Sequence, residues 1–195
     1  KYKVSRTPVR DAFKALAAEG LLEVVTHVGT FVSYIDIREI SDILFMREVI
    51  EQAVLKILAD NYTQAQVLKI RLALNEQQKL IKQMASFSSD EQKEAGTKFL
   101  LLDNQFHELL FSLAGKKKIW EMLVQSNPQY ERFRTFINMS GKNDLKRLYE
   151  DHVTIAECIA NNDLERLQDK ISHHIYDGFN ASALEVRKHP EFFRA

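Results

Sequence analysis

Apolar residues recur at helical spacing over most of the chain, from residue 36 to residue 187. Polar and turn-forming residues interrupt this pattern and divide it into amphipathic segments. We expect helices over residues 36–61, 63–86, 89–114, 117–139, 143–161 and 163–187. Short connections between them predict an antiparallel six-helix bundle. Pro128 lies inside the fourth segment and is expected to kink or interrupt that helix.

The beginning of the chain follows a different pattern. Residues 7–19 are expected to form a short helix, with Thr7 as its N-cap and Pro8 at its first position, where a missing N–H costs nothing. Two β-branched and aromatic runs follow, over residues 21–25 and 30–35, and a short turn containing glycine joins them. The sequence therefore predicts a helix and a β-hairpin ahead of an all-helical domain.

Composition supports helices and limits the possible classes of protein. The 195 residues include only 6 Gly and 3 Pro, too few for a turn-rich β-sandwich or barrel. The single cysteine, Cys158, excludes an internal disulfide framework. No apolar run approaches the ~18 residues that a membrane span needs, and no signal peptide opens the chain. We therefore expect a cytoplasmic protein.

Charge is balanced overall but unevenly distributed. The chain carries 27 basic and 27 acidic residues, and residues 1–14 hold five of the basic and one of the acidic ones. The remaining residues therefore include 22 basic and 26 acidic ones. A basic first segment on a mildly acidic body is typical of a nucleic-acid-binding protein. A solvated charge cluster at one end of the chain would give the same pattern.

Three of the expected helices place a metal-ligating residue type on an apolar stripe. Asp103 and His107 are four residues apart and share one face of the third helix. His152 and His174 lie among apolar residues of the fifth and sixth helices, whereas His173 points away and is expected at the surface. Imidazole and carboxylate suit Zn²⁺, Ni²⁺, Mn²⁺ or Fe²⁺, so the four inward residues are candidates for one divalent metal site. The alternative is a hydrogen-bonded polar group in the core at each position.

Arginines on the same helices offer candidate anion partners. Arg47 lies on the apolar stripe of the first long helix, with Glu51 one turn later. It forms either a local ion pair at the core edge or an anion anchor that faces a cavity of the bundle. Arg132 and Arg134 offer the same two alternatives. If the cluster binds a metal ion that activates water, a helical metal-dependent hydrolase is one possible function.

Several stretches resemble a family of bacterial regulators. The run from Ser5 to Phe13 resembles the recognition-helix region of GntR-type winged helix-turn-helix regulators. The run from Gly29 to Val32 resembles the tip of their wing. The body resembles the FCD-type effector domain of the FadR subfamily, and the matching residues are Arg47 with Glu51, Asp103-x-x-x-His107, His152 and His174.

The resemblance implies a mainly α protein with three parts. Residues 1–35 would form part of a winged helix-turn-helix domain, whose first helices would lie upstream of Lys1. Residues 36–187 would form an all-helical domain for metal binding, effector binding and dimerisation, and residues 188–195 a C-terminal tail. Such a protein is a metabolite-responsive transcriptional regulator, most often a repressor, that binds double-stranded operator DNA as a homodimer.

The resemblance also implies roles for individual residues. Arg6 and Arg10 would contact bases or phosphates, and Thr7 a phosphate through its backbone N–H. Gly29 and Thr30 would place the wing on the DNA backbone or in the minor groove.

The helical domain would hold Zn, Ni or Mn through Asp103, His107, His152 and His174. A small carboxylate metabolite would complete the coordination of the metal, with Arg47 or Arg134 as its counter-charge.

Overall fold

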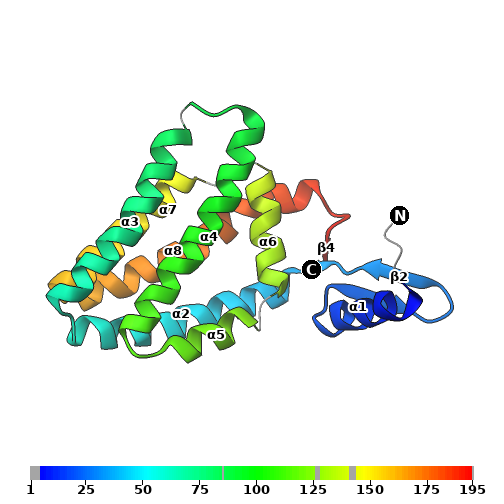
Figure 1. The fold of residues 1–195 in the computed structure, drawn as a ribbon, viewed down its shortest axis with the longest axis horizontal. Coiled ribbons are helices and arrows are strands. Elements are labelled where there is room, and N and C mark those ends of the chain that lie inside the picture. Colours follow the sequence, from blue (N-terminus) through cyan, green and yellow to red (C-terminus); the bar gives the residue numbers. More distant parts are fainter. Residues whose placement is uncertain (1–4, 85, 126–127, 141–143, 195) are drawn as a thin grey trace.

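The computed structural model describes residues 5–84, 86–125, 128–140 and 144–194. Its elements are, in chain order, α1 (Arg6–Ala18), β1 (Leu22–Val25), β2 (Gly29–Val32), β3 (Ile35–Asp36), α2 (Ile37–Asp60), α3 (Gln64–Met84), α4 (Ser89–Leu113), α5 (Lys117–Gln125), α6 (Pro128–Met139), α7 (Leu145–Asn161), α8 (Leu164–Lys188) and β4 (Phe193–Arg194). The fold is mainly α, with a helix and a hairpin ahead of a helical domain (Figure 1), as the sequence predicts.

The predicted count of six helices in the bundle is wrong. The segment expected to form one helix over residues 117–139 forms two, α5 and α6, so the described part of the helical domain contains α2 to α8. The predicted interruption at Pro128 is confirmed, because α6 begins at this residue. A proline ring is compatible with the first position of a helix but clashes with the preceding turn in a helix interior.

The N-cap of the first helix lies two residues earlier than predicted. Ser5 has extended backbone angles (φ −71°, ψ 168°) and occupies the N-cap position, so Arg6 is the first helical residue. Thr7 is therefore not the cap, and Pro8 lies further inside the first turn. Its missing N–H still costs nothing, because N–H groups of the first turn have no partner within a helix. Gly20, at φ +71°, has the left-handed conformation that commonly ends a helix.

The second predicted strand is also shorter than expected. β1 and β2 form an antiparallel hairpin with Leu22 opposite Val32, where β2 ends. The chain then leaves the hairpin, and Ile35–Asp36 pairs in parallel with Phe193–Arg194 of the C-terminal tail. The linker between hairpin and α2 is thereby tied to the far end of the chain.

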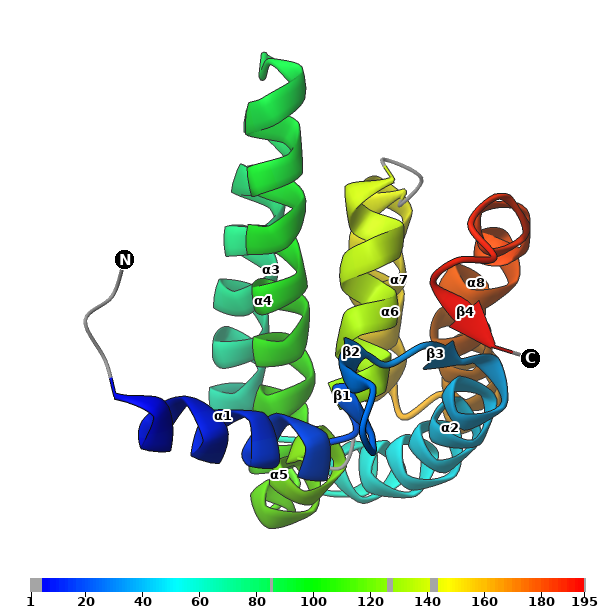
Figure 2. The same ribbon diagram turned by 90° about the vertical axis from the view of Figure 1, so that its right-hand side faces the viewer.

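The helices enclose one large core. Helix α3 packs mainly on α4, and α8 packs on both α2 and α7 (Figures 1 and 2). The fully buried side chains of this core include those of Ile40, Phe106, Leu110, Ile155 and Ile171. None of the helices in the described ranges is long and apolar enough to cross a membrane.

Residues 5–32 form a small winged unit, made of α1, β1 and β2, that lies beside the helices (Figure 1). Helix α1 buries no side chain within the described part of the chain, and its apolar residues Val9 and Phe13 are 41% and 45% exposed. The root of the hairpin is hydrogen-bonded to α6, and this contact connects the winged unit to the helical domain.

Candidate functional site

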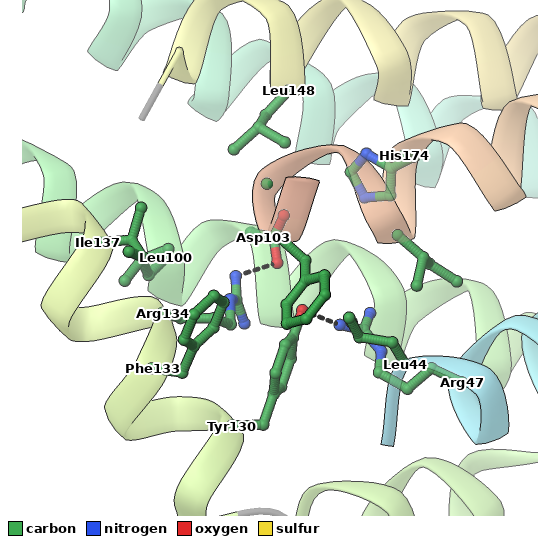
Figure 3. Close-up of a pocket in the computed structure, with 13 residues that line it drawn as sticks. Leu44, Arg47, Leu100, Asp103, Tyr130, Phe133, Arg134, Ile137, Leu148 and His174 are labelled. Carbon is green, nitrogen blue, oxygen red and sulfur yellow. Dashed lines mark hydrogen bonds and ion pairs between the residues drawn. The ribbon is translucent and has the colours of Figure 1, made fainter. Parts of the chain in front are cut away.

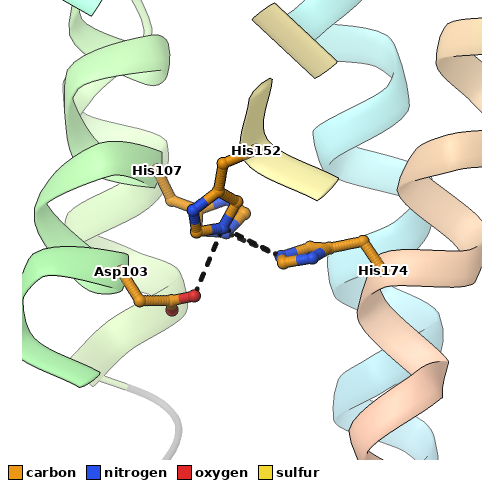
Figure 4. Close-up of side chains that lie close together, drawn as sticks. All are labelled: Asp103, His107, His152 and His174. Atoms are coloured by element: carbon orange, nitrogen blue, oxygen red, sulfur yellow. Dashed lines mark hydrogen bonds and ion pairs between the residues drawn. The ribbon is translucent and has the colours of Figure 1, made fainter. Parts of the chain in front are cut away.

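Asp103, His107, His152 and His174 converge inside the helical domain (Figure 4). Each offers one ligand atom, and these atoms all lie within 4.8 Å of one another. The Nε2 atom of His174 is 3.2 Å from that of His107 and 3.3 Å from that of His152. Oδ1 of Asp103 is 3.3 Å from Nε2 of His152. All four side chains are buried, so the structure brings together the four residues singled out in the sequence.

Local capping determines where the three helices that carry these residues begin. Ser88 and Glu91 form a reciprocal capping box at the start of α4. Asp144 and Asp163 accept hydrogen bonds from backbone N–H groups in the first turns of α7 and α8. From these starts, the helical repeat turns the apolar stripes of α4, α7 and α8 inward together with their polar residues.

The second ring nitrogen of each histidine faces an oxygen atom from another residue. The contacts are His107 Nδ1 to Glu51 Oε2 (2.8 Å), His152 Nδ1 to Gln77 Oε1 (2.8 Å) and His174 Nδ1 to Asp151 Oδ2 (3.5 Å). The orientation of the Gln77 amide follows from its other end, where Nε2 donates to the carbonyl of Leu102 at 3.2 Å. Helices α2 and α3 therefore also contribute to the centre.

Of these three contacts, the one between His152 and Gln77 is a hydrogen bond, whereas at His107 and His174 the facing carboxylate favours a proton on Nδ1 through its charge. A neutral imidazole has one N–H and one lone pair, and an oxygen acceptor beside Nδ1 keeps the N–H there. Three Nε2 lone pairs and an oxygen of Asp103 are then directed at one point, where they repel one another. A cation at that point removes the repulsion, and metal-ligating histidines commonly have such outer partners. The donor set therefore fits a divalent metal ion.

Burial and neighbouring charges favour protonation states that can bind a metal. Burial alone would raise the pKa of Asp103, but the guanidinium of Arg134, 2.5 Å from its Oδ2, and the nearby histidines lower that pKa well below its usual value. Burial lowers the pKa of His152 and His174, so both rings are neutral at neutral pH. An ionised carboxylate and neutral imidazoles are the forms that ligate metals.

A cavity of ≈ 60 Å³ lies beside the centre, with Arg47 and Arg134 on either side of Tyr130 (Figure 3). Nη1 of Arg47 donates to the hydroxyl of Tyr130 at 2.9 Å. His174 and Asp103 also line the cavity, so it borders the candidate metal centre directly. The apolar part of its wall is formed by Leu44, Leu100, Phe133, Ile137, Leu148 and Phe179.

The two interpretations of Arg47 are compatible in the structure. Arg47 forms the predicted ion pair with Glu51 at 2.8 Å and also lines the cavity. It lies inside the core, 5% exposed, rather than at the core edge. Burial would raise the pKa of Glu51, but the charge of Arg47 lowers it to about 2. Glu51 thus stays ionised between Arg47 and His107.

The two arginines of α6 have different roles. Arg134 lines the cavity and pairs with Asp103, in agreement with one of the predicted alternatives. Arg132 forms neither the predicted ion pair nor part of the cavity wall, because its guanidinium donates to Gln129 and to Ser33, at the root of the wing. Its partner Ser33 belongs to the linker that follows the hairpin, and helical periodicity does not predict where that linker runs.

Two side chains at the centre, those of Gln77 and Asp151, were not predicted from the sequence. Gln77 could have been found, since it follows Ile70 and Leu74 on the apolar stripe of α3 and is fully buried. Asp151 precedes His152 and so points away from the centre along its own helix; it reaches His174 only because α7 and α8 pack together. Its second neighbour is Lys170.

The other histidines lie outside the centre. His173 is exposed, as predicted. His27 is in the hairpin turn with a left-handed backbone (φ 63°), and His189 caps the end of α8.

The candidate DNA contacts lie on the surface of the winged unit. Arg6, Thr7 and Arg10 occupy the first turns of α1 and are all exposed. Gly29 and Thr30 begin β2 and are also exposed. Arg6, Arg10 and Thr30 line one open groove between α1 and the hairpin, whose other lining residues are mainly apolar and include Val9 and Phe13.

Comparison with known families identifies both parts of the chain. A profile described as "FCD domain" matches residues 42–177, and one described as "Bacterial regulatory proteins, gntR family" matches residues 1–32. The HTH-type transcriptional repressor RspR of Escherichia coli K12 is 25% identical over 188 residues, which is 96% of this chain and 77% of that protein. The Nta operon transcriptional regulator of Aminobacter aminovorans is 26% identical over 181 residues, 91% of this chain and 78% of that protein.

Solved structures show the same fold. E. coli McbR/YncC superposes with a TM-score of 0.65 at 15% identity, covering 93% of this chain and 82% of that one. A GntR family member from Pseudomonas syringae pv. tomato superposes with a TM-score of 0.55 at 23% identity, covering 97% of this chain and 75% of that one. At these identities the likeness concerns the arrangement of the winged unit and the helical domain alone.

Proposed function

This chain belongs to the GntR family of bacterial transcriptional regulators and carries an FCD domain, and from that premise we propose that its helical domain binds one divalent metal ion and a small carboxylate that controls operator binding. The relatives are regulators rather than enzymes, which leaves the hydrolase alternative without support. One observation carries the proposal: three histidine Nε2 atoms and a carboxylate oxygen meet within 4.8 Å in a buried centre.

The residues that would hold the metal are Asp103, His107, His152 and His174. Three imidazoles and one carboxylate suit Zn, Ni or Mn, and four protein ligands leave positions on a five- or six-coordinate ion for an effector. Bound there, the ion would act as a Lewis acid that accepts carboxylate oxygens.

The charges around the centre explain why the effector should be an anion. Three buried or partly buried ion pairs surround it, Arg47 with Glu51, Arg134 with Asp103, and Lys170 with Asp151, and Glu131 also contacts Arg134 at 3.3 Å. Each positive side chain therefore has a negative partner, and these pairs give the metal-free centre no excess positive charge. A divalent cation leaves an uncompensated charge of about +2 in the core, which is costly without a counter-ion. A carboxylate offsets part of that charge.

The cavity limits the kind of carboxylate. Its volume of ≈ 60 Å³ restricts the effector to a few heavy atoms, and its far wall is apolar. A second carboxylate group directed at Leu100, Ile137 or Leu148 would be buried without a partner. We therefore favour a short monocarboxylate with an apolar body over a dicarboxylate, with Arg47 or Arg134 as the counter-charge.

The winged unit supplies the DNA contacts in this proposal. Arg6 and Arg10 would reach bases or phosphates, and the backbone N–H of Thr7 would bind a phosphate at the N-terminus of α1. Gly29 and Thr30 would bring the wing to the DNA backbone. A homodimer would match a palindromic operator in the cytoplasm, and repression is the favoured outcome because a relative is described as a repressor.

Elemental analysis of the purified full-length protein tests the metal site. We expect about one divalent ion per chain after reconstitution, and at least a tenfold lower affinity in His152→Ala. His173→Ala is the matched control, since His173 is an exposed histidine beside the centre. Absence of metal after reconstitution, or equal loss in the control, would refute the site.

Calorimetric titration with acetate, propionate, butyrate and succinate tests the effector. Binding of a monocarboxylate should require the metal, because the metal-free centre has no excess positive charge. Equal binding to chelated protein would contradict the charge argument.

A further inference from the structure

Helix α6 has two faces that contact different parts of the molecule. Tyr130, Phe133, Arg134 and Ile137 recur at helical spacing and line the cavity. Gln129 and Arg132 are one turn apart and lie about 120° around the helix from that face. The same twelve-residue helix therefore borders the candidate metal centre on one side and another surface on the other.

The inner face of α6 contacts the centre through charged groups. Nη2 of Arg134 lies 2.5 Å from Oδ2 of Asp103, one of the four candidate ligands, and Nη1 donates to Oδ1 of Asn104 at 2.7 Å. The hydroxyl of Tyr130 accepts from Arg47 at 2.9 Å. A change in the charge or position of Asp103 therefore acts directly on α6 through Arg134 (Figure 3).

The outer face of α6 contacts the winged unit through a closed set of hydrogen bonds. Nη2 of Arg132 donates to the carbonyl of Ser33 at 2.7 Å, and Nη1 donates to the hydroxyl of Ser33 at 2.8 Å. Nε2 of Gln129 donates to the carbonyl of Gly20 at 2.7 Å, and the Ser33 hydroxyl donates to the same carbonyl at 2.5 Å. Gly20 follows α1 and Ser33 follows β2, so these hydrogen bonds connect α6 to both ends of the hairpin. We call this set of contacts the α6 clamp.

The α6 clamp is suited to respond to small movements. The three acceptors of Arg132 are neutral oxygen atoms, of Ser33 and Gln129, so the contact depends on geometry and not on a long-range ion pair. Hydrogen bonds weaken steeply when their distance or angle departs from the optimum. Helix shifts of about 1–2 Å are typical of allosteric transitions and are large enough to break such contacts.

We propose that Gln129 and Arg132 are positioning residues that hold the winged unit in one orientation, and that α6 transmits ligand binding at the metal centre to this clamp. The transmission rests on the function proposed above, whereas the holding role does not. A cation that binds Asp103 competes with Arg134 for its negative charge. The weakened Arg134–Asp103 contact shifts α6, and the rigid helix carries the shift to the α6 clamp.

The holding role can be tested without any metal or effector. Spin labels at Val28→Cys in the wing and Lys146→Cys on α7 report the distance between winged unit and helical domain, since both side chains are at least 71% exposed. The buried Cys158 does not compete for the label. Labelled subunits are diluted with unlabelled ones so that each distance is measured within one chain.

The Gln129→Ala, Arg132→Ala double variant should broaden this distance distribution in the metal-free protein. Arg132→Lys, which keeps one donor for the Ser33 carbonyl, should restore part of the wild-type distribution. Glu157→Gln, at an exposed position of α7, is the control and should change nothing. A distribution as narrow as that of wild type in the double variant would overturn the holding role.

Transmission is tested by operator titration of the full-length protein at fixed salt, with and without zinc and propionate. Coupling in such systems is typically about 5–150-fold in affinity. The double variant should bind zinc and propionate as wild type does, but its operator affinity should change less than about twofold when they are added. A full response in the double variant would overturn transmission. Failure of wild type to bind zinc would instead refute the metal site, while the label distances would still decide on the clamp.

Discussion

Replacing Glu51 by glutamine separates the charge of this residue from its shape. Glu51 is fully buried and lies 2.8 Å from both Arg47 and His107. Its pKa is lowered from 4.5 to about 2 despite burial, chiefly because of the charge of Arg47. That difference corresponds to about 3 kcal/mol of unfolding free energy at neutral pH, since one pKa unit is ~1.4 kcal/mol. Removal of one partner from a buried ion pair commonly costs about 3–5 kcal/mol, which agrees.

Urea unfolding of the metal-free protein, followed by circular dichroism, measures this cost. We expect Glu51→Gln to lower the free energy of unfolding by about 3 kcal/mol at pH 7. The control Glu157→Gln, at an exposed position, should stay within about 0.5 kcal/mol of wild type. Because the pKa is lower in the folded state, the stabilisation is complete above pH 4.5 and is lost as pH falls toward 2. The difference between wild type and Glu51→Gln should therefore shrink by about 2 kcal/mol from pH 5 to pH 3. A difference that does not depend on pH would refute this account.

The same variant also bears on the metal centre. A glutamine amide can present its N–H₂ group to Nδ1 of His107, which would move the ring proton to Nε2 and remove the lone pair that faces the centre. Loss of an outer partner typically lowers metal affinity about 10–100-fold. Unchanged zinc affinity in Glu51→Gln would show that Glu51 does not orient His107.

Other expectations concern packing, protons and DNA. Gly96→Ala should lower the free energy of unfolding by about 1–3 kcal/mol, because a Cβ there would lie 2.3 Å from Oδ1 of Asn138. Gly178→Ala, where a Cβ would meet no atom within 4 Å, should raise it by about 0.5–1 kcal/mol. Thermal unfolding measures both changes. Burial lowers the pKa of the two histidines on α7 and α8, so zinc affinity should stay constant down to about pH 6.5 and fall only below it, as competition with a chelator would show. In the full-length protein, Arg6→Ala or Arg10→Ala should weaken operator binding by ~1–3 kcal/mol if the arginine contacts a base. If it contacts a phosphate, the slope of log affinity against log salt concentration should instead fall by about one.

Helical periodicity was sufficient to find the inward-facing residues of the candidate centre. Asp103 and His107 share a face of α4, and the structure places both inside the core. The same rule applied to α3 would have found Gln77. It cannot find Asp151, because the contact of this residue with His174 depends on how two helices pack and not on the face of either one.

Positions that depend on the path between elements could not be predicted from local pattern. Arg132 and Arg134 are two residues apart on α6, yet one contacts the wing and the other the metal centre. Periodicity places them on different faces but does not say what each face meets. The parallel pairing of Ile35 with Phe193 likewise joins residues far apart in the chain, which no local pattern encodes.

The polar centre lies within the main core, and this location decides what each ligand can do. Helices α2, α3, α4, α7 and α8 each contribute a side chain to the centre or to its outer partners. A metal that binds only the folded chain stabilises that arrangement by mass action, about 2.7 kcal/mol at a hundredfold excess over its Kd. Helix α6 supplies none of the four candidate ligands and reaches the centre through Arg134. We therefore expect the metal to hold these five helices in place, and α6, the helix that contacts the winged unit, to respond through the weakened Arg134–Asp103 contact.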